Sequence, residues 1–249
     1  MIFRTIKALS AFVLLSLAGV AIAQQAVDKK VDETLRKALA QPALNLEVST
    51  VEASEIPGIY AVQFLNGPLV YATADGRFFV VGDLYATGGD AFVNLTEQRR
   101  DGDRMKQLAA VKKEDMIIFP AKGETKAFIS VFTDVTCFYC QKLHLEVEAL
   151  NKAGIEVRYL AYPRAGLASD GYRKLETAWC AEDRQDTITR LKAKKAVTEQ
   201  SCGANPIADQ FQLGQAIGVR GTPAIVTQEG RLIPGYQTAD ELIANLGIK

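Results

Sequence analysis

The chain has 249 residues, and its 29 basic residues balance its 29 acidic ones. This balance gives no electrostatic basis for binding nucleic acid or an anionic membrane, so we expect no nucleic-acid partner. The length is typical of one large domain or two smaller ones.

The first 23 residues have the pattern of a secretory signal peptide. Arg4 and Lys7 form a basic start, residues 8–20 are apolar, and Ala21-Ile22-Ala23 is a small-x-small cleavage signal. The alternative is an uncleaved membrane anchor, but the apolar stretch is shorter than the ~20 residues that a span needs. We therefore expect cleavage after Ala23 and a secreted, periplasmic context in which disulfides can form.

Residues 24–90 are expected to form a small N-terminal domain. Apolar residues four apart predict a helix over 27–40, and the alternating segment 44–48 predicts a half-buried strand. Asn66-Gly67 and Asp75-Gly76 are hairpin signals between the apolar runs at 59–65, 69–73 and 78–81. A unit of this size has a thin core, and self-association through an edge strand would add to it and cover the edge.

Residues 91–115 predict a linker helix. Asn94 with Glu97 resembles a capping box, and the charged stretch that follows carries only a thin apolar stripe. A mostly polar helix between two domains indicates a connector exposed to solvent.

Residues 116–249 alternate strands and helices. The predicted order is a strand at 127–133, a helix after Cys137 that ends at Gly154, a strand at 155–161, helices at 170–181 and 184–196, a helix that begins at Asn205-Pro206, a hairpin at 224–233 and a helix capped by Thr238 and Glu241. This order predicts a thioredoxin-like α/β fold with a helical insertion, joined to an α+β N-terminal domain.

The motif Cys137-Phe138-Tyr139-Cys140 lies where the buried strand leads into a helix. Two thiols at this spacing can form a disulfide, and the helix N-terminus favours the thiolate of the first. Since Phe138 and Tyr139 carry no charge, the helix terminus is the main expected stabiliser. We expect the sulfur of Cys137 to be exposed, ionised at neutral pH and the attacking nucleophile, with Cys140 as the resolving thiol.

A structural disulfide or half of a zinc site is the alternative for this pair. Zinc usually takes a second close pair of ligands, but Cys180 and Cys202 are far apart in sequence and His144 is the only histidine. We therefore expect no metal and no cofactor beyond the redox-active cysteines.

Gly221-Thr222-Pro223 precedes a late strand, where thioredoxin-like folds place a cis proline beside the two thiols. Only about 5–6% of X-Pro bonds are cis in general, but this position favours a cis bond before Pro223. The Thr222 backbone would then face the dithiol and could pair with an extended substrate.

Four further features have structural and functional interpretations. Cys180 and Cys202 are expected to form a structural bridge worth about 3 kcal/mol rather than a second redox pair, with Trp179 beside it in the core.

His144 is a candidate base or ligand, but its place one turn into the helix favours a structural role. Asp134 could tune proton transfer or simply cap the loop, and Lys192, Lys194 and Lys195 predict a solvated helix face.

The segment from Val131 to His144 resembles the active-site segment of the bacterial periplasmic disulfide isomerases of the DsbC and DsbG family. Further similarities lie at 157–164, 179–181, 221–224 and 234–237, so the resemblance covers essentially the whole mature chain. One departure is Phe138, where that family typically has glycine or proline.

The resemblance implies a V-shaped homodimer with cystatin-like N-terminal dimerisation domains and thioredoxin-like catalytic domains. It also implies that Cys137 attacks, Cys140 resolves, Pro223 is cis and Cys180–Cys202 is a structural disulfide. The partners implied are misoxidised or unfolded secreted proteins and a membrane thiol reductase of the DsbD type, with chaperone activity besides. The alternatives are a DsbG-like reductase that protects single cysteines and a non-enzymatic holdase.

Overall fold

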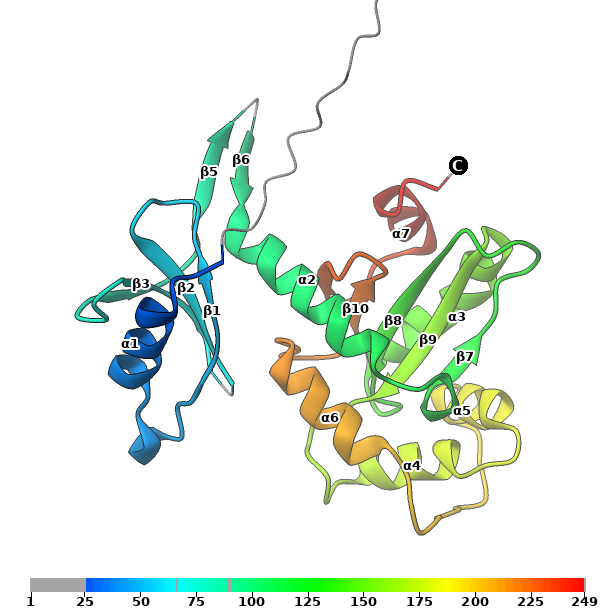
Figure 1. Ribbon diagram of the computed structural model, residues 1–249. Coiled ribbons are helices and arrows are strands. Elements are labelled where there is room, and N and C mark those ends of the chain that lie inside the picture. The colour runs from blue at the N-terminus through cyan, green and yellow to red at the C-terminus, as the bar shows by residue number, and fades with distance from the viewer. Residues whose placement is uncertain (1–25, 66, 89–90, 249) are drawn as a thin grey trace, which may run out of the picture. The chain divides into compact units, whose positions relative to one another are not determined.

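The computed structural model describes residues 26–65, 67–88 and 91–248 (Figure 1). The expected signal peptide lies outside these residues. The described chain forms two compact units that divide between Gly82 and Asp83. None of the helices in the described ranges has the length and apolar character needed to cross a membrane.

The N-terminal unit is one helix packed on an antiparallel sheet. Its strands pair in the order β1-β2-β3-β4, and its core gathers around Leu35 and Val62, both fully buried. The elements are α1 (Lys29–Leu39), β1 (Val48–Ala53), β2 (Ile59–Phe64), β3 (Leu69–Thr73) and β4 (Phe79–Val81). The helix and the three apolar runs are therefore where the sequence predicted them.

The strand predicted at 44–48 is wrong. Residues Pro42–Leu44 form a 3-10 turn, Asn45 adopts a left-handed conformation with φ of 54°, and β1 begins only at Val48. Proline favours the first position of a helical turn and asparagine tolerates positive φ, so local turn chemistry overrides the alternating pattern.

The C-terminal unit begins with a hairpin and a long helix. These are β5 (Tyr85–Gly88), β6 (Ala91–Asn94) and α2 (Leu95–Ala109), and the Asn94 side chain accepts the N–H of Glu97 as an N-cap. The helix ends six residues before the predicted boundary at 115, and a 3-10 turn over Lys113–Asp115 follows after a short break.

The helix α2 packs on the rest of this unit. Arg104 is 5% exposed, and its Nε donates to the carbonyl of Ile217 at 2.9 Å. Leu108 lies in the same apolar cluster as Ile217. This part of α2 is therefore held against the body of the C-terminal unit, which differs from the solvent-exposed connector that its polar sequence indicated.

A five-stranded sheet forms the centre of the C-terminal unit, in the order β11-β10-β8-β9-β7. β8 and β9 are parallel, and the other pairs are antiparallel. The strands are β7 (Ile117–Phe119), β8 (Ala127–Thr133), β9 (Ile155–Ala161), β10 (Ala224–Thr227) and β11 (Leu232–Pro234).

Each face of β8 contributes to a different core. Ile129 and Val131 pack with the apolar side of the helix that follows, whereas Phe132 packs with the cluster of α2. The helices around the sheet are α3 (Phe138–Lys152), α4 (Asp170–Trp179), α5 (Arg184–Lys192), α6 (Ile207–Ala216) and α7 (Ala239–Asn245) (Figure 1).

The predicted helix ends in this unit are confirmed at two places. Gly154 follows α3 with φ of 89°, and Thr238 with Glu241 forms a complete capping box on α7. The helix predicted to begin with Asn205 as its N-cap begins one residue later, because Pro206 is the N-cap residue of α6. The helix predicted at 184–196 is shorter, because α5 ends at Lys192.

Candidate active site

The two cysteines of the CxxC motif lie at the start of α3. Cys137 is the N-cap residue, its N–H donates to the carbonyl of Asp134 at 3.1 Å, and its own carbonyl accepts the N–H of Gln141. Cys140 lies in the first turn. Unsatisfied backbone N–H groups at this end of the helix favour a negative charge on the first sulfur.

Both cysteines are free thiols in this structure, and their environments separate their acidities. The hydrogen bond from Cys140 lowers the pKa of Cys137 to about 5, against the opposing effect of burial. Burial raises the pKa of Cys140. The first thiol is therefore an anion at neutral pH, whereas the second stays protonated.

The expectation that Cys137 is exposed is wrong, since the residue keeps only 2% of its accessible surface. The Cys137 thiol is nevertheless less deeply buried than the Cys140 thiol. Its neighbours Phe138 and Tyr139 are 67% and 55% exposed.

The loop before β10 closes over the first thiol. The Thr222–Pro223 peptide bond is cis, and the protonated Cys137 thiol donates to the Thr222 carbonyl at 3.2 Å. Beside this loop lies a hollow of about 320 Å³, whose lining includes Arg220, Thr222, Pro223 and Leu232. The sequence motif at 221–223 thus lies directly beside Cys137.

The buried carboxylate of Asp134 organises the loop in front of the thiols. One oxygen accepts the backbone N–H and the hydroxyl of Thr136 at 2.8 and 2.7 Å. The other accepts the backbone N–H and the Nε of Arg164 at 3.0 and 3.4 Å. Asp134 is 2% exposed, so its geometry supports the loop-capping interpretation.

Comparisons with known proteins agree with this geometry. Residues 112–247 match a thioredoxin-like domain, and residues 21–97 match the disulfide bond isomerase protein N-terminal domain. The thiol:disulfide interchange protein DsbC of Escherichia coli K12 is 39% identical over 88% of this chain and 86% of its own length, and that of Salmonella typhimurium LT2 is 41% identical over 86% of each. The chain belongs to the DsbC family.

A solved disulfide interchange protein from Neisseria gonorrhoeae is also similar. The two chains are 30% identical, the match covers 56% of this chain and 100% of that chain, and the TM-score is 0.49.

The DsbC relatives are named for thiol:disulfide interchange, so this chain is a thiol–disulfide exchange enzyme of the isomerase type. Such exchange uses the sulfurs themselves and needs no cofactor.

The structural role expected for His144 is confirmed in this DsbC-family chain. Its two ring nitrogens lie 2.9 Å from the Tyr159 hydroxyl and 2.9 Å from the Thr189 hydroxyl. Burial, with a further contribution from Lys192, lowers the pKa of His144 to about 3. The imidazole is therefore neutral at neutral pH and both of its nitrogens are occupied.

The solvated position predicted for Lys192 is wrong. Lys192 is 4% exposed, and its ammonium donates to the Thr133 hydroxyl at 2.6 Å and to the Cys140 carbonyl at 3.3 Å. Lys194 and Lys195 are exposed, as expected. Because α5 ends at Lys192, this side chain turns inward under α3. Three lysines within four residues are typical of a solvated helix face, so the sequence did not indicate that one of the three side chains is buried.

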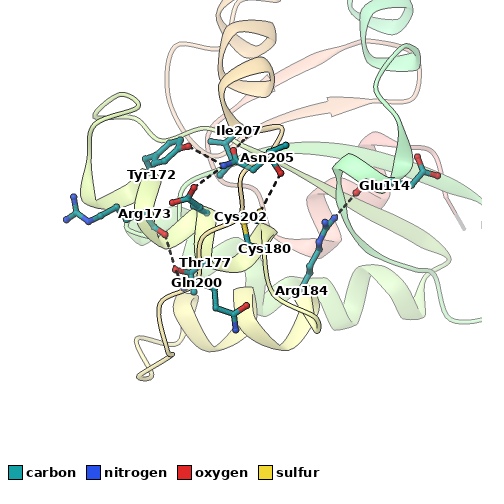
Figure 2. The surroundings of a disulfide bond; sticks show 12 residues. Glu114, Tyr172, Arg173, Thr177, Cys180, Arg184, Gln200, Cys202, Asn205 and Ile207 are labelled. Atoms are coloured by element: carbon teal, nitrogen blue, oxygen red, sulfur yellow. Dashed lines mark hydrogen bonds between the residues drawn. A yellow bond between two sulfur atoms is a disulfide. The ribbon is translucent and has the colours of Figure 1, made fainter.

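The other two cysteines are bonded to each other. Cys180 and Cys202 form a disulfide between the end of α4 and the loop before α6, and Figure 2 shows hydrogen bonds from Asn205 to Tyr172 and from Gln200 to Thr177 around it. Trp179 is 1% exposed. Within the described residues, no group of three or more His, Cys, Asp or Glu side chains could hold a metal ion.

Proposed function

We propose that this DsbC-family enzyme rearranges incorrect disulfides in secreted proteins, with Cys137 as the attacking thiol and Cys140 as the resolving thiol. The observation that carries the proposal is the place of Cys137 as the N-cap residue of α3 beside the cis Thr222–Pro223 bond, with its pKa lowered to about 5. A thiolate in this position is the nucleophile that disulfide exchange requires.

The reaction begins when the Cys137 thiolate attacks one sulfur of a substrate disulfide. A new bond forms between Cys137 and that sulfur, the substrate bond breaks, and its other sulfur leaves as a thiolate. If a substrate thiolate then displaces Cys137, the substrate is isomerised and no net electrons are transferred. If Cys140 displaces the substrate sulfur, the substrate is reduced and Cys137–Cys140 is oxidised.

The acidities of the two thiols favour isomerisation. Because burial raises the pKa of Cys140, little of it is ionised when the mixed disulfide exists. The mixed disulfide then has time to be attacked by the substrate's own thiols. A low pKa at Cys137 also makes it a good leaving group in this second step.

Substrate approaches between the cis-proline loop and the aromatic residues of the motif. The Thr222 backbone beside Pro223 offers hydrogen bonds to an extended chain, and the exposed rings of Phe138 and Tyr139 offer an apolar contact. Tyr139 stacks on Tyr236, with 6.4 Å between ring centroids, whereas Phe138 is the more exposed of the pair. We infer that movement of the Phe138 side chain gives a substrate access to Cys137.

The setting of this activity is the periplasm, reached through the signal peptide at 1–23. There the enzyme works as a homodimer whose chain has an N-terminal domain at 24–90, a linker helix at 91–115 and a catalytic domain at 116–249, and it acts on misoxidised or unfolded secreted proteins. A membrane reductase of the DsbD type returns Cys137–Cys140 to the dithiol, and the exposed apolar residues support chaperone activity.

A refolding assay tests the assignment. A scrambled multi-disulfide protein is incubated with the wild type, with Cys140→Ala and with Cys137→Ala, and native disulfides are counted over time. The wild type restores native pairing, Cys140→Ala keeps part of the isomerase activity, and Cys137→Ala loses it. No gain in native disulfides with the wild type would contradict the isomerase assignment and leave a DsbG-like reductase. Equal recovery with Cys137→Ala would identify a holdase.

A further inference from the structure

The ammonium group of Lys192 is buried directly beneath the first turn of α3. It donates to the Thr133 hydroxyl at 2.6 Å and to the Cys140 carbonyl at 3.3 Å, and it lies 4.9 Å from the centre of the Tyr159 ring. These three groups come from β8, α3 and β9. The cation is thus fixed in place by neutral partners around the resolving cysteine.

This buried cation has no salt bridge to a carboxylate among the described residues. Asp134 is the acid that acts on it, but the hydrogen bonds of the Asp134 carboxylate go to Thr136 and Arg164. The backbone N–H of Asp134 donates to the Cys140 sulfur at 3.5 Å. A buried ammonium without a paired anion is costly. Thiolates are the remaining anions that face it, since Cys140 and Cys137 both act on Lys192 electrostatically.

The other titratable groups around the site do not change charge near neutral pH. His144 faces Lys192 from α3 and has a pKa of about 3, and burial raises the pKa of Tyr159 on β9 well above its usual value. Arg164 acts on Cys137 electrostatically from the loop after β9. Burial lowers the pKa of Lys192 itself to about 8.

We propose that Lys192 is a positioning residue that supplies the counter-charge for the Cys140 thiolate and so sets how fast the mixed disulfide is resolved. In that step the Cys140 thiolate attacks the Cys137 sulfur of the Cys137–substrate disulfide. The Cys137–Cys140 bond forms, the bond to the substrate breaks, and the electron pair leaves with the substrate sulfur, which takes a proton from water. Lys192 lowers the cost of ionising Cys140 without exchanging a bond.

The consequence for the enzyme rests on the proposed function. A charged Lys192 speeds resolution by Cys140 and therefore favours reduction, whereas its absence prolongs the mixed disulfide and favours isomerisation. Lys192 is then the residue through which this chain balances the two outcomes.

The direct test uses the Cys137→Ser variant. The chain has 4 cysteines, and Cys180 and Cys202 are paired in a disulfide, so Cys140 is the one free thiol left in this variant. The rate of Cys140 alkylation by iodoacetamide is followed from neutral pH to well above pH 8 in this background. Without a titrating neighbour the rate rises tenfold per pH unit below the thiol pKa. With Lys192 the rise flattens near pH about 8, where the cation loses its charge.

In the same background, Lys192→Met lowers the rate at neutral pH on the order of tenfold, equivalent to one pKa unit. Its profile keeps the full slope, and the two curves converge at high pH. Lys192→Arg retains the charge and restores the neutral-pH rate without the flattening. Lys195→Met, an exposed neighbour, is the matched control and leaves the profile unchanged.

A profile that rises with full slope through pH 8 in the Cys137→Ser protein overturns the proposal, and this result needs no change at Lys192. The proposal is also overturned if the alkylation rate of Cys140 flattens near the same pH in the Cys137→Ser protein and in the Cys137→Ser protein that also carries Lys192→Met. Because alkylation of Cys140 does not involve substrate, its outcome is independent of the isomerase assignment. In the refolding assay, Lys192→Met raises the ratio of isomerised to reduced substrate, and an unchanged ratio there would overturn the role of Lys192 in resolving the mixed disulfide.

Discussion

Asp134 shows how one buried side chain can fix the geometry of the attacking cysteine. Its two oxygens together accept four hydrogen bonds, two from Thr136 and two from Arg164, and its own carbonyl accepts the N–H of Cys137. The carboxylate thus joins the loop before α3 to the loop after β9.

We predict that Asp134→Asn destabilises the protein. The asparagine amide has one acceptor oxygen, and its NH₂ group would replace the other carboxylate oxygen. The donors of either Thr136 or Arg164 would then face the NH₂ group, which is itself a donor. Leaving buried donors unsatisfied costs about 1–3 kcal/mol in the free energy of unfolding, measured by urea denaturation. Asp103→Asn is the control, since the Asp103 side chain is 52% exposed. An equal, small effect of both substitutions would contradict the organising role of Asp134.

Single residues also show where sequence reasoning succeeds. The CxxC motif, Thr222 and Pro223 are recognisable because their residue types and spacing are unusual, and the fold brings them together. Lys192 could not be placed, since its burial depends on where α5 ends and on which way the last side chain turns. The burial of Cys137 was missed for a similar reason: it depends on a loop that arrives from 85 residues along the chain.

At the scale of elements, the helical insertion is held by the disulfide between Cys180 and Cys202. The pair joins the end of α4 to the loop before α6, at a sequence separation of 22 residues. The segment between them contains α5 and therefore Lys192. Constraining this loop lowers the entropy of the unfolded chain.

We predict that replacing both Cys180 and Cys202 by alanine lowers the free energy of unfolding by about 3 kcal/mol. Urea denaturation of the reduced-dithiol protein measures the difference. Thiol–disulfide exchange at Cys137 continues in the variant under conditions where it is folded. Complete loss of exchange by a folded variant would show that this pair takes part in the chemistry.

Elements with strong periodicity were predicted well, and elements set by local turns or tertiary contacts were not. The helix α1 and the strand β8 were found from apolar spacing alone. The segment Pro42–Leu44 became a turn because of Pro42 and Asn45. The packing of α2 rests on Arg104 and its bond to Ile217, 113 residues away, and a polar helix sequence gives no sign of such a contact.

For the whole molecule, the N-terminal sheet ends in an unusual edge. Phe78, Phe79, Val80 and Val81 are all more than half exposed, with 54–67% of each residue accessible, and β4 is the last strand of its sheet. An exposed apolar edge strand is a site for pairing with another chain. This edge supports the proposed homodimer, with β4 as its contact.

We predict that Val80→Lys converts the dimer to a monomer. A charge at the centre of the edge would be buried without a partner on association. Light scattering at micromolar concentration measures the mass. Leu145→Lys serves as the control, since Leu145 is 79% exposed on α3 in the other unit. A wild type that is monomeric in this measurement, or a Val80→Lys protein that stays dimeric, would contradict the assignment of β4 as the contact.

Disulfide exchange by this enzyme depends on the ionisation of Cys137, which a pH titration of thiolate ultraviolet absorbance in the reduced protein measures. Since its pKa is lowered, the thiolate is present at neutral pH and is lost as the pH falls through about 5. We expect a one-thiol transition there that is absent from Cys137→Ala, with exchange activity falling along the same curve. A Cys137 that titrates near 9.0, its ordinary value, would rule out an ionised nucleophile at neutral pH.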